Sequence, residues 1–281
     1  MDKLQKTEWQ IEHKEVMDSF LQELYSHTDE FILKGGTALQ ECYGLDRFSE
    51  DIDLDRRKEQ GDFIKHVEDF CEKNGYSFRV AKDTDTTKRV FINYGDNSRP
   101  LKVELSQRRL NIPETEIQKI NGITTYSIDR LCSMKASAYN GRDRIRDLYD
   151  LTFICNQYKD SLSENTLSSV KDVLEYKGIE QFDYLLEQEK DELIDSDKLA
   201  SDFLLMYENL GLLYNEEERI IMNEITTSIV GEDSLVHTDQ GFMKNEEFAD
   251  RIIDGSSGDF ELVKNSREEF LEDRDIDDFE L

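Results

Sequence analysis

The spacing of apolar residues changes period several times in the first part of the chain. Helical spacing over 8–25 predicts a helix, and the apolar run over 31–33 predicts a short buried strand. The pattern then predicts helices over 37–43 and 63–73 and strands over 51–55, 77–81, 89–94 and 101–106. Helices interspersed with strands indicate a domain built on a sheet.

The rest of the chain is predicted to be mainly helical. From Ile128 onward, apolar residues recur at helical spacing almost throughout, and both prolines, Pro100 and Pro113, precede this part. Between 229 and 242 the composition becomes polar and glycine-bearing, and an acidic run ends the chain. We therefore expect an α/β domain over 1–127, a helical domain over 128–228 and an acidic, partly mobile segment over 229–281.

A glycine pair follows the first predicted strand. The chain runs Lys34-Gly35-Gly36-Thr37 where that strand gives way to a helix. Backbone N–H groups at such a helix N-terminus can bind an anion, and glycine lets a phosphate approach closely. A glycine pair taken alone is more often a plain turn, and the spacing of a Walker P-loop is absent.

Three aspartates alternate with apolar residues over 51–55. The alternation places Asp51, Asp53 and Asp55 on one face of a strand, with Ile52 and Leu54 on the other. Crowded carboxylates repel each other unless a cation neutralises them, and Mg²⁺ typically takes one or two carboxylates plus substrate phosphates. An edge strand with its acids in water is the alternative. The Asp-x-Asp triplet alone decides nothing, because it occurs six times among 32 aspartates.

The strand predicted over 101–106 alternates in the same way. Its apolar residues fall on one face, and Lys102, Glu104 and Ser106 fall on the other. Glu104 is therefore a candidate third carboxylate for the aspartate site. A Lys/Glu pair that only faces solvent is the alternative, and it is the commoner one for such a strand taken singly.

A group of charged residues follows in the helical part. In a helix that begins near Ser127, Lys135 and Arg142 share one face, and further along Asp147 and Asp150 are spaced i, i+3. Beside a nucleotide site, these cations would bind phosphate. The alternative is a surface helix in which Arg146 pairs with Asp150.

Charge is distributed unevenly. The formal net charge is −29, with 25 basic and 30 acidic residues in 1–160 (net −5) and 10 basic and 34 acidic residues in 161–281 (net −24). The stretch 102–146 carries nine basic and five acidic residues, a local net charge of +4, and is the only basic island. Since phosphate affinity comes largely from Lys and Arg, a nucleic acid is expected to contact this island alone.

The remaining composition excludes several classes of protein. The four cysteines and four histidines are scattered without the spacing of a zinc site or a disulfide framework. No apolar run is long enough to cross a membrane, and the N-terminus lacks a signal-peptide pattern. We expect a cytoplasmic protein with reduced thiols and no membrane partner.

Taken together, these motifs resemble those of the DNA polymerase beta-like nucleotidyltransferase superfamily. The order is strand, Gly35-Gly36-Thr37, helix, the run 47–54 (RFSEDIDL), and then Glu104 on a later strand. Within that superfamily the chain looks most like the AbiEii/AbiGii (MenT-like) toxins, whose lysine helix and R-D-x-x-D helix are matched by Lys135 and by 146–150. The resemblance spans about 30–155. It implies an α+β fold, with a polymerase beta-like mixed sheet and flanking helices followed by a mainly helical C-terminal domain.

The resemblance also implies a role for each matching residue. Asp51, Asp53 and Glu104 would bind two Mg²⁺ ions, with Mn²⁺ as an alternative, and Lys135 would neutralise the triphosphate. Asp147 or Asp150 would orient that lysine or the base, and Asp150 is counted among the catalytic residues with Lys135 and the three metal ligands. The expected nucleotide-binding residues are Lys34, Gly35, Gly36, Thr37, Arg47, Ser49, Arg142 and Asp147.

Three of these expectations stay open at the level of sequence. Arg47 contacts phosphate or pairs with Asp46 or Glu50, and Ser49 contacts phosphate or serves as a turn or cap. Nothing in the pattern says whether Asp55 reaches the metal ions.

The activity implied is transfer of a nucleoside monophosphate from an NTP to a hydroxyl, with pyrophosphate as the leaving group. The expected acceptor is RNA, at the 3′ end of tRNA, and the protein would be the toxin of a toxin–antitoxin or phage abortive-infection pair with a cognate antitoxin. One alternative keeps the site but changes the acceptor to a protein or small-molecule hydroxyl. Another is an inactive acidic protein that binds a partner.

Overall fold

The computed structural model describes residues 7–57, 61–95, 99–109, 111–179, 181–213, 235–238 and 241–244. The chain divides into two compact units, Met1–Met206 and Tyr207–Leu281. The expected boundaries at 127/128 and 228/229 are not tested by this division and stay predictions. The tail over 245–281 lies outside the described residues.

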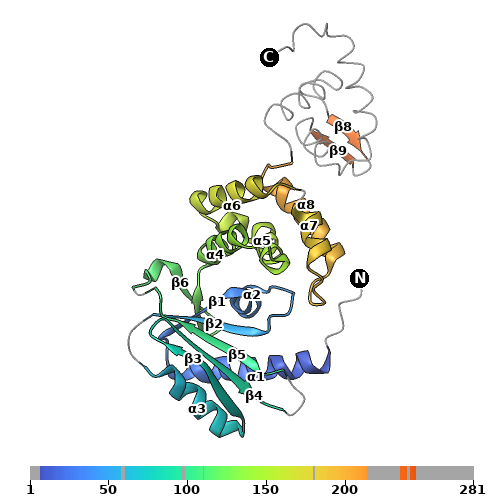
Figure 1. Cartoon of the computed structure of the whole chain (residues 1–281). Coiled ribbons are helices and arrows are strands. Elements are labelled where there is room, and N and C mark those ends of the chain that lie inside the picture. Colours follow the sequence, from blue (N-terminus) through green and yellow to red (C-terminus); the bar gives the residue numbers. More distant parts are fainter. Residues whose placement is uncertain are drawn as a thin grey trace. The chain divides into compact units, whose positions relative to one another are not determined.

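The first unit is built on one mixed sheet of seven strands, in the order β3-β4-β5-β2-β1-β7-β6 (Figure 1). β2 lies in the middle, parallel to β5 and antiparallel to β1, while β1 is parallel to β7. The strands are β1 (Phe31–Lys34), β2 (Asp51–Arg56), β3 (Ser77–Thr84), β4 (Thr87–Asn93), β5 (Leu101–Ser106), β6 (Ile117–Ile120) and β7 (Ile123–Tyr126).

The expected alternation on β2 and β5 is present. The apolar residues Ile52, Leu54, Val103 and Leu105 are fully buried, whereas the intervening charged residues up to Asp53 and Glu104 keep part of their surface exposed. A central strand normally carries apolar residues on both faces, so acids at this position need a partner or a function.

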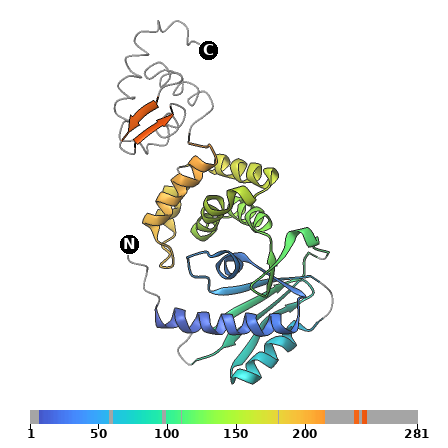
Figure 2. The same ribbon diagram turned by 180° about the vertical axis from the view of Figure 1, so that it is seen from behind.

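Two helices pack against the sheet and each other. α1 (Glu8–His27) and α3 (Phe63–Asn74) meet through Phe20 and Phe70, whose ring centroids lie 5.2 Å apart edge to face. Asp62 caps α3 by accepting hydrogen bonds from two backbone N–H groups. Figure 2 shows both helices along the sheet from behind. This layer supplies the core on which the central strands rest.

The glycine-bearing helix α2 (Gly35–Tyr43) begins directly after β1, two residues earlier than its predicted start at Thr37. It lies between the sheet and the helices α4 (Ile128–Gly141) and α5 (Ile145–Tyr158) in both views (Figures 1 and 2). Both glycines therefore belong to its first turn, where backbone N–H groups have no partner within the helix.

The helical part continues from α4 and α5 through α6 (Glu164–Lys177), α7 (Gln181–Gln188) and α8 (Ser196–Asn209). This confirms a mainly helical region after the sheet. Short 3₁₀ turns lie at Glu114–Glu116 and Lys159–Ser161. In the second unit the strands β8 (Leu235–Thr238) and β9 (Gly241–Lys244) pair antiparallel. Within the described residues, no helix is both long enough and apolar enough to cross a membrane.

The hairpin of β6 and β7 was not predicted. Its turn is Asn121-Gly122, with φ of 52° and 85°, and residues of this type suit the tight turn that joins two antiparallel strands. The signal was present as Asn-Gly between isoleucines. It matters for the site because β7 adds a neighbour to β1 and brings Tyr126 toward β2.

Candidate active site

The predicted acids lie together on the two central strands. In the register of β2 with β5, Asp51 is opposite Lys102 and Asp53 is opposite Glu104. On the other side of β2, Lys34 of β1 is opposite Asp53. Residues directly opposite on one sheet face have neighbouring side chains, so Asp53 and Glu104 are adjacent although 51 positions separate them in the sequence.

Two cations from neighbouring strands neutralise part of this charge. Lys102 Nζ lies 2.5 Å from Asp51 Oδ2, and Arg89 Nε on β4 lies 2.6 Å from Glu104 Oε2. The expected Lys/Glu pair of β5 is thus not merely solvent-facing, because Lys102 binds an aspartate of the next strand. Sequence reasoning assigned neither Lys102 nor Arg89 to the site.

The surroundings of Asp53 disfavour its negative charge. Burial raises its pKa above the ordinary value, and the carboxylates of Asp51 and Glu104 raise it further. Lys102 and Lys34 oppose the shift without cancelling it. A carboxylate in this state would gain from an additional cation.

Asp55 has two protein partners in the structure. Its Oδ1 lies 2.5 Å from Lys34 Nζ, and its Oδ2 accepts a hydrogen bond of 2.8 Å from the Tyr126 hydroxyl. Asp55 is buried and both of its oxygens are occupied. Lys34, expected to bind nucleotide, forms an ion pair with Asp55, and its role in nucleotide binding stays a prediction.

The first turn of α2 lies against the carboxylates. Gly35 has φ +74°, and a Cβ built there would stand 3.3 Å from Asp53 Oδ2. The Thr37 hydroxyl donates to the backbone carbonyl of Asp51 and is also hydrogen-bonded to the Ser49 hydroxyl, with 2.8 Å between their oxygens. Thr37 and Ser49 are buried, so their hydroxyls join α2 to the start of β2.

Gly36 is packed against the segment that leads into β2. A Cβ there would stand 2.6 Å from Arg47 Nη2 and 3.0 Å from Ser49 Oγ. Gly36→Ala is expected to cost about 1–3 kcal/mol of stability by overpacking, because Arg47 is fixed and cannot move aside. Nucleotide binding should weaken with it. Thermal unfolding and nucleotide titration of the variant measure both effects.

Gly141→Ala is the matched control for that variant. Gly141 ends α4, and a Cβ there would meet nothing within 4 Å. This control should unfold at or slightly above the wild-type temperature, since Ala favours helix over Gly. Equal behaviour of the two variants would contradict the packing role of Gly36.

A buried ion pair joins the sheet domain to the helices. Arg47 Nε and Nη2 lie 2.6 Å from the two carboxylate oxygens of Asp150 on α5, with side-chain exposures of 4% and 0%. Lys135 Nζ on α4 lies 2.5 Å from Asp150 Oδ2. Burial alone would raise the pKa of Asp150, but Arg47 and Lys135 hold it below the ordinary value. Arg47 therefore pairs with neither Asp46 nor Glu50.

Asp147 is a second carboxylate that contacts Lys135. Its carboxylate accepts from Arg142 Nε at 2.6 Å and from Lys135 Nζ at 3.3 Å. The alternative of an Arg146–Asp150 pair is wrong, because Arg146 contacts Glu50 at 2.9 Å and also binds Asp191. Lys135, Arg142, Asp147 and Asp150 are thus brought together as the resemblance implied.

The fit to metal ions can be judged from the donors. Within the residues that the structure describes, no three His, Cys, Asp or Glu side chains are arranged to hold a metal. Asp51, Asp53 and Glu104 are nonetheless oxygen donors of the kind that Mg²⁺ prefers. Their mutual repulsion at Asp53 fits a cation, which would replace Lys102 and Arg89 as their partner.

Two solved structures from Helicobacter pylori are similar to this chain. The structure of JHP933 is 28% identical with a TM-score of 0.62, and the match covers 79% of this chain and 99% of that one. A candidate nucleotidyltransferase is 28% identical with a TM-score of 0.61, covering 75% of this chain and 100% of that one. The second of these supports a nucleotidyltransferase fold. No curated protein gives a significant match.

The sequence also matches a family model described as nucleotidyl transferase AbiEii toxin, type IV toxin–antitoxin system. The match runs over residues 19–215, more than half of the 281 residues, and includes every predicted site residue. This chain belongs to the AbiEii family of nucleotidyltransferase toxins.

Proposed function

We propose that this toxin transfers a nucleoside monophosphate from an NTP to a hydroxyl of RNA, at the 3′ end of tRNA. The observation that carries the proposal is the side-by-side placement of Asp51, Asp53 and Glu104 next to the glycine turn of α2. Type IV toxin–antitoxin membership implies an antitoxin, and a role in abortive infection follows as part of the proposal.

The reaction forms one bond and breaks one. The acceptor oxygen attacks the α-phosphorus, the bond to the β-phosphate oxygen breaks, and pyrophosphate leaves while the hydroxyl proton is released. Asp51, Asp53 and Glu104 would hold Mg²⁺ or Mn²⁺, which supplies charge stabilisation at the attacking and leaving oxygens.

The surrounding residues would bind the triphosphate. The free N–H groups of the first turn of α2 are suited to phosphate oxygens, and Gly35 leaves room for them beside Asp53. Lys135 and Arg142 would add two cations for the triphosphate, and both are held in place by Asp147, with Lys135 also bound to Asp150. Since these positions are set before substrate binds, they need little reorganisation to stabilise charge.

Metal binding can be measured without catalysis. Mg²⁺ or Mn²⁺ should raise the melting temperature of the wild-type protein, because an ion that binds only the folded state stabilises it. The increase should be lost in Asp53→Asn and kept in Asp172→Asn, which changes an exposed acid on α6. An equal response of wild type and Asp53→Asn would place the ion elsewhere.

The acceptor is identified by where the label goes. Purified protein is incubated with each α-labelled NTP, Mg²⁺, tRNA and a protein extract. Label on tRNA, removed by digestion from the 3′ end, is the expected result. Absence of transfer to any acceptor would contradict the proposal.

The acidity of the chain favours one other acceptor class. A net charge of −29 disfavours polyanionic partners in general, which suits a protein or small-molecule hydroxyl as the acceptor. Label on protein or drug, with none on RNA, would establish this alternative. The alternative of an inactive binding protein is disfavoured. Placing the carboxylates of Asp51 and Glu104 near that of Asp53 is unfavourable, and without a function nothing would compensate for it.

A further inference from the structure

A second polar feature lies beside the candidate site. A pocket of about 570 Å³ is bordered by the junction of α4 and α5 and by the segment after α7. This volume is in the range of pockets that hold a ligand of nucleotide size. Its basic lining residues are Arg142, Arg144, Arg146 and Lys190.

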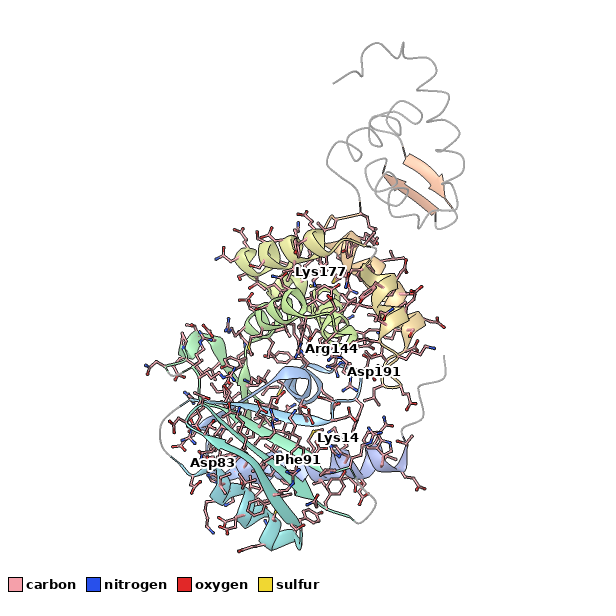
Figure 3. The ribbon with its side chains drawn as sticks, viewed as in Figure 1. Lys14, Asp83, Phe91, Arg144, Lys177 and Asp191 are labelled. Atoms are coloured by element: carbon pink, nitrogen blue, oxygen red, sulfur yellow. The ribbon has the colours of Figure 1, made fainter. Side chains whose placement is uncertain are left out.

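Two acids from the segment after α7 form ion pairs with two of these cations. Glu189 Oε1 lies 2.5 Å from Arg144 Nη1, and both oxygens of Asp191 accept from Arg146. Figure 3 shows Arg144 and Asp191 near one another, and both line the pocket. Carboxylates therefore take positions that phosphate oxygens could take, because guanidinium groups bind both in the same forked geometry.

The pocket is electrostatically continuous with the carboxylate face. Arg142 and Asp147 line it, and Asp147 also binds Lys135. The pKa of Arg142 is raised by its hydrogen bond to Asp147, with further contributions from the charges of Asp53 and Glu189. Arg142 thus lies within electrostatic reach of Asp53 and of Glu189, which lines the pocket.

We propose that this pocket binds backbone phosphates of the acceptor RNA, and that Glu189 and Asp191 hold the place of those phosphates until RNA binds. The inference rests on the proposed function and adds a location to it. RNA entering here would displace the two acids and lead its terminal hydroxyl toward Asp53.

The arrangement favours a polymer over the NTP. Beyond Arg142, which the proposed function assigns to the triphosphate, Arg144 and Arg146 add two separate cations to the pocket lining, which suits successive singly charged phosphates better than one compact triphosphate. The Arg144 side chain is 65% exposed, so it faces an incoming macromolecule. An ion pair this exposed contributes little to stability, and its acid can be exchanged for phosphate at low cost.

Glu189 also makes a structural hydrogen bond, and the variant used in the test must preserve it. Its Oε2 accepts a hydrogen bond of 2.8 Å from the backbone N–H of Ile145, the first residue of α5. Glu189→Gln keeps an acceptor at this helix start while removing the charge. The substitution therefore separates the proposed effect on RNA from loss of the cap.

The test measures binding of end-labelled tRNA to the full chain without NTP. Fluorescence anisotropy at several salt concentrations gives the affinity. Arg144→Ala should weaken binding about fivefold to tenfold and make the salt dependence shallower by about one ion. Glu189→Gln should tighten binding severalfold, the opposite direction. Arg79→Ala, which removes an exposed arginine stacked on Phe91 of β4, should leave binding unchanged.

The outcomes separate this inference from the proposed function. If tRNA is labelled but Arg144→Ala and Glu189→Gln bind it as wild type does, the pocket assignment is wrong and the function stands. If both variants change only the affinity for NTP, the pocket belongs to the donor and the assignment is wrong again. If wild type neither binds nor labels tRNA, both are overturned.

Discussion

Asp53→Asn is expected to abolish nucleotide transfer, by at least about a thousandfold, and to raise the melting temperature at neutral pH. The activity should be lost because a neutral amide replaces the carboxylate at the centre of the proposed metal site. The gain in stability should follow because the substitution removes a buried charge repelled by Asp51 and Glu104.

The direction of the stability effect comes from the pKa shift. The pKa of Asp53 is raised in the folded protein, so the folded state binds more protons than the unfolded state just above the ordinary aspartate value. Stability contributed by this group therefore falls as the pH rises through that window, and the full penalty is present at pH 7. Thermal unfolding between pH 4 and pH 7 should show a smaller decline for Asp53→Asn than for wild type.

Asp172→Asn is the control for that experiment. It removes one charge from an exposed position on α6 and should change neither activity nor melting temperature appreciably. A destabilised Asp53→Asn variant that retains transfer would contradict the account of the site.

Asp150→Asn should instead destabilise the protein strongly. The substitution leaves Arg47 and Lys135 without their shared carboxylate in a buried site, at a cost of about 3–5 kcal/mol. For a domain of this size, that corresponds to a melting temperature lower by roughly 10 °C. Activity should also fall, because Lys135 loses the group that positions it.

The pH dependence of this effect has the opposite sign to that of Asp53. The pKa of Asp150 is lowered in the folded state, so its contribution is present above the ordinary aspartate value and is lost as the pH falls through the folded value. Wild type and Asp150→Asn should converge in stability at acid pH and diverge toward neutrality. A constant difference across the range would show that the ion pair is not its source.

The aspartates over 51–55 show how much of the site can be predicted from the sequence. Alternation along 51–55 predicted which residues share a face, because the side-chain period of a strand is fixed. It did not predict that Asp55 would be bound by Lys34 and Tyr126, since that depends on the pairing of β1 with both β2 and β7. The face on which a strand side chain lies is set by the local sequence, whereas its contact partners and its burial depend on how the strands pair.

Long-range ion pairs were the least predictable part of the site. Arg47 lies 103 positions before Asp150, and the sequence suggested only phosphate or one of its nearer acids, Asp46 or Glu50, as its partner. The actual partner is selected by the packing of α5 near the start of β2. Lys102 was likewise visible as a charged residue on the right face, but its contact with Asp51 follows from the parallel register of β2 and β5.

The position of the two glycines between a strand and a helix was predicted correctly, but the packing that requires glycine there was not. Their position between strand and helix indicated a phosphate-binding turn. The structure adds that Gly36 is needed to accommodate Arg47 and that Gly35 has a left-handed backbone beside Asp53. Close packing of the site against α2 and the proposed binding of phosphate would thus place demands on the same two residues.

The central claim, transfer of nucleotides to the 3′ end of RNA through Asp53, is tested most directly by sequencing RNA 3′ ends. Cells expressing wild type are compared with cells expressing Asp53→Asn at equal protein levels. The account predicts added nucleotides on tRNA 3′ ends, together with growth arrest, in wild type alone. Growth arrest by wild type with unchanged RNA ends, or arrest that persists in Asp53→Asn, would contradict it.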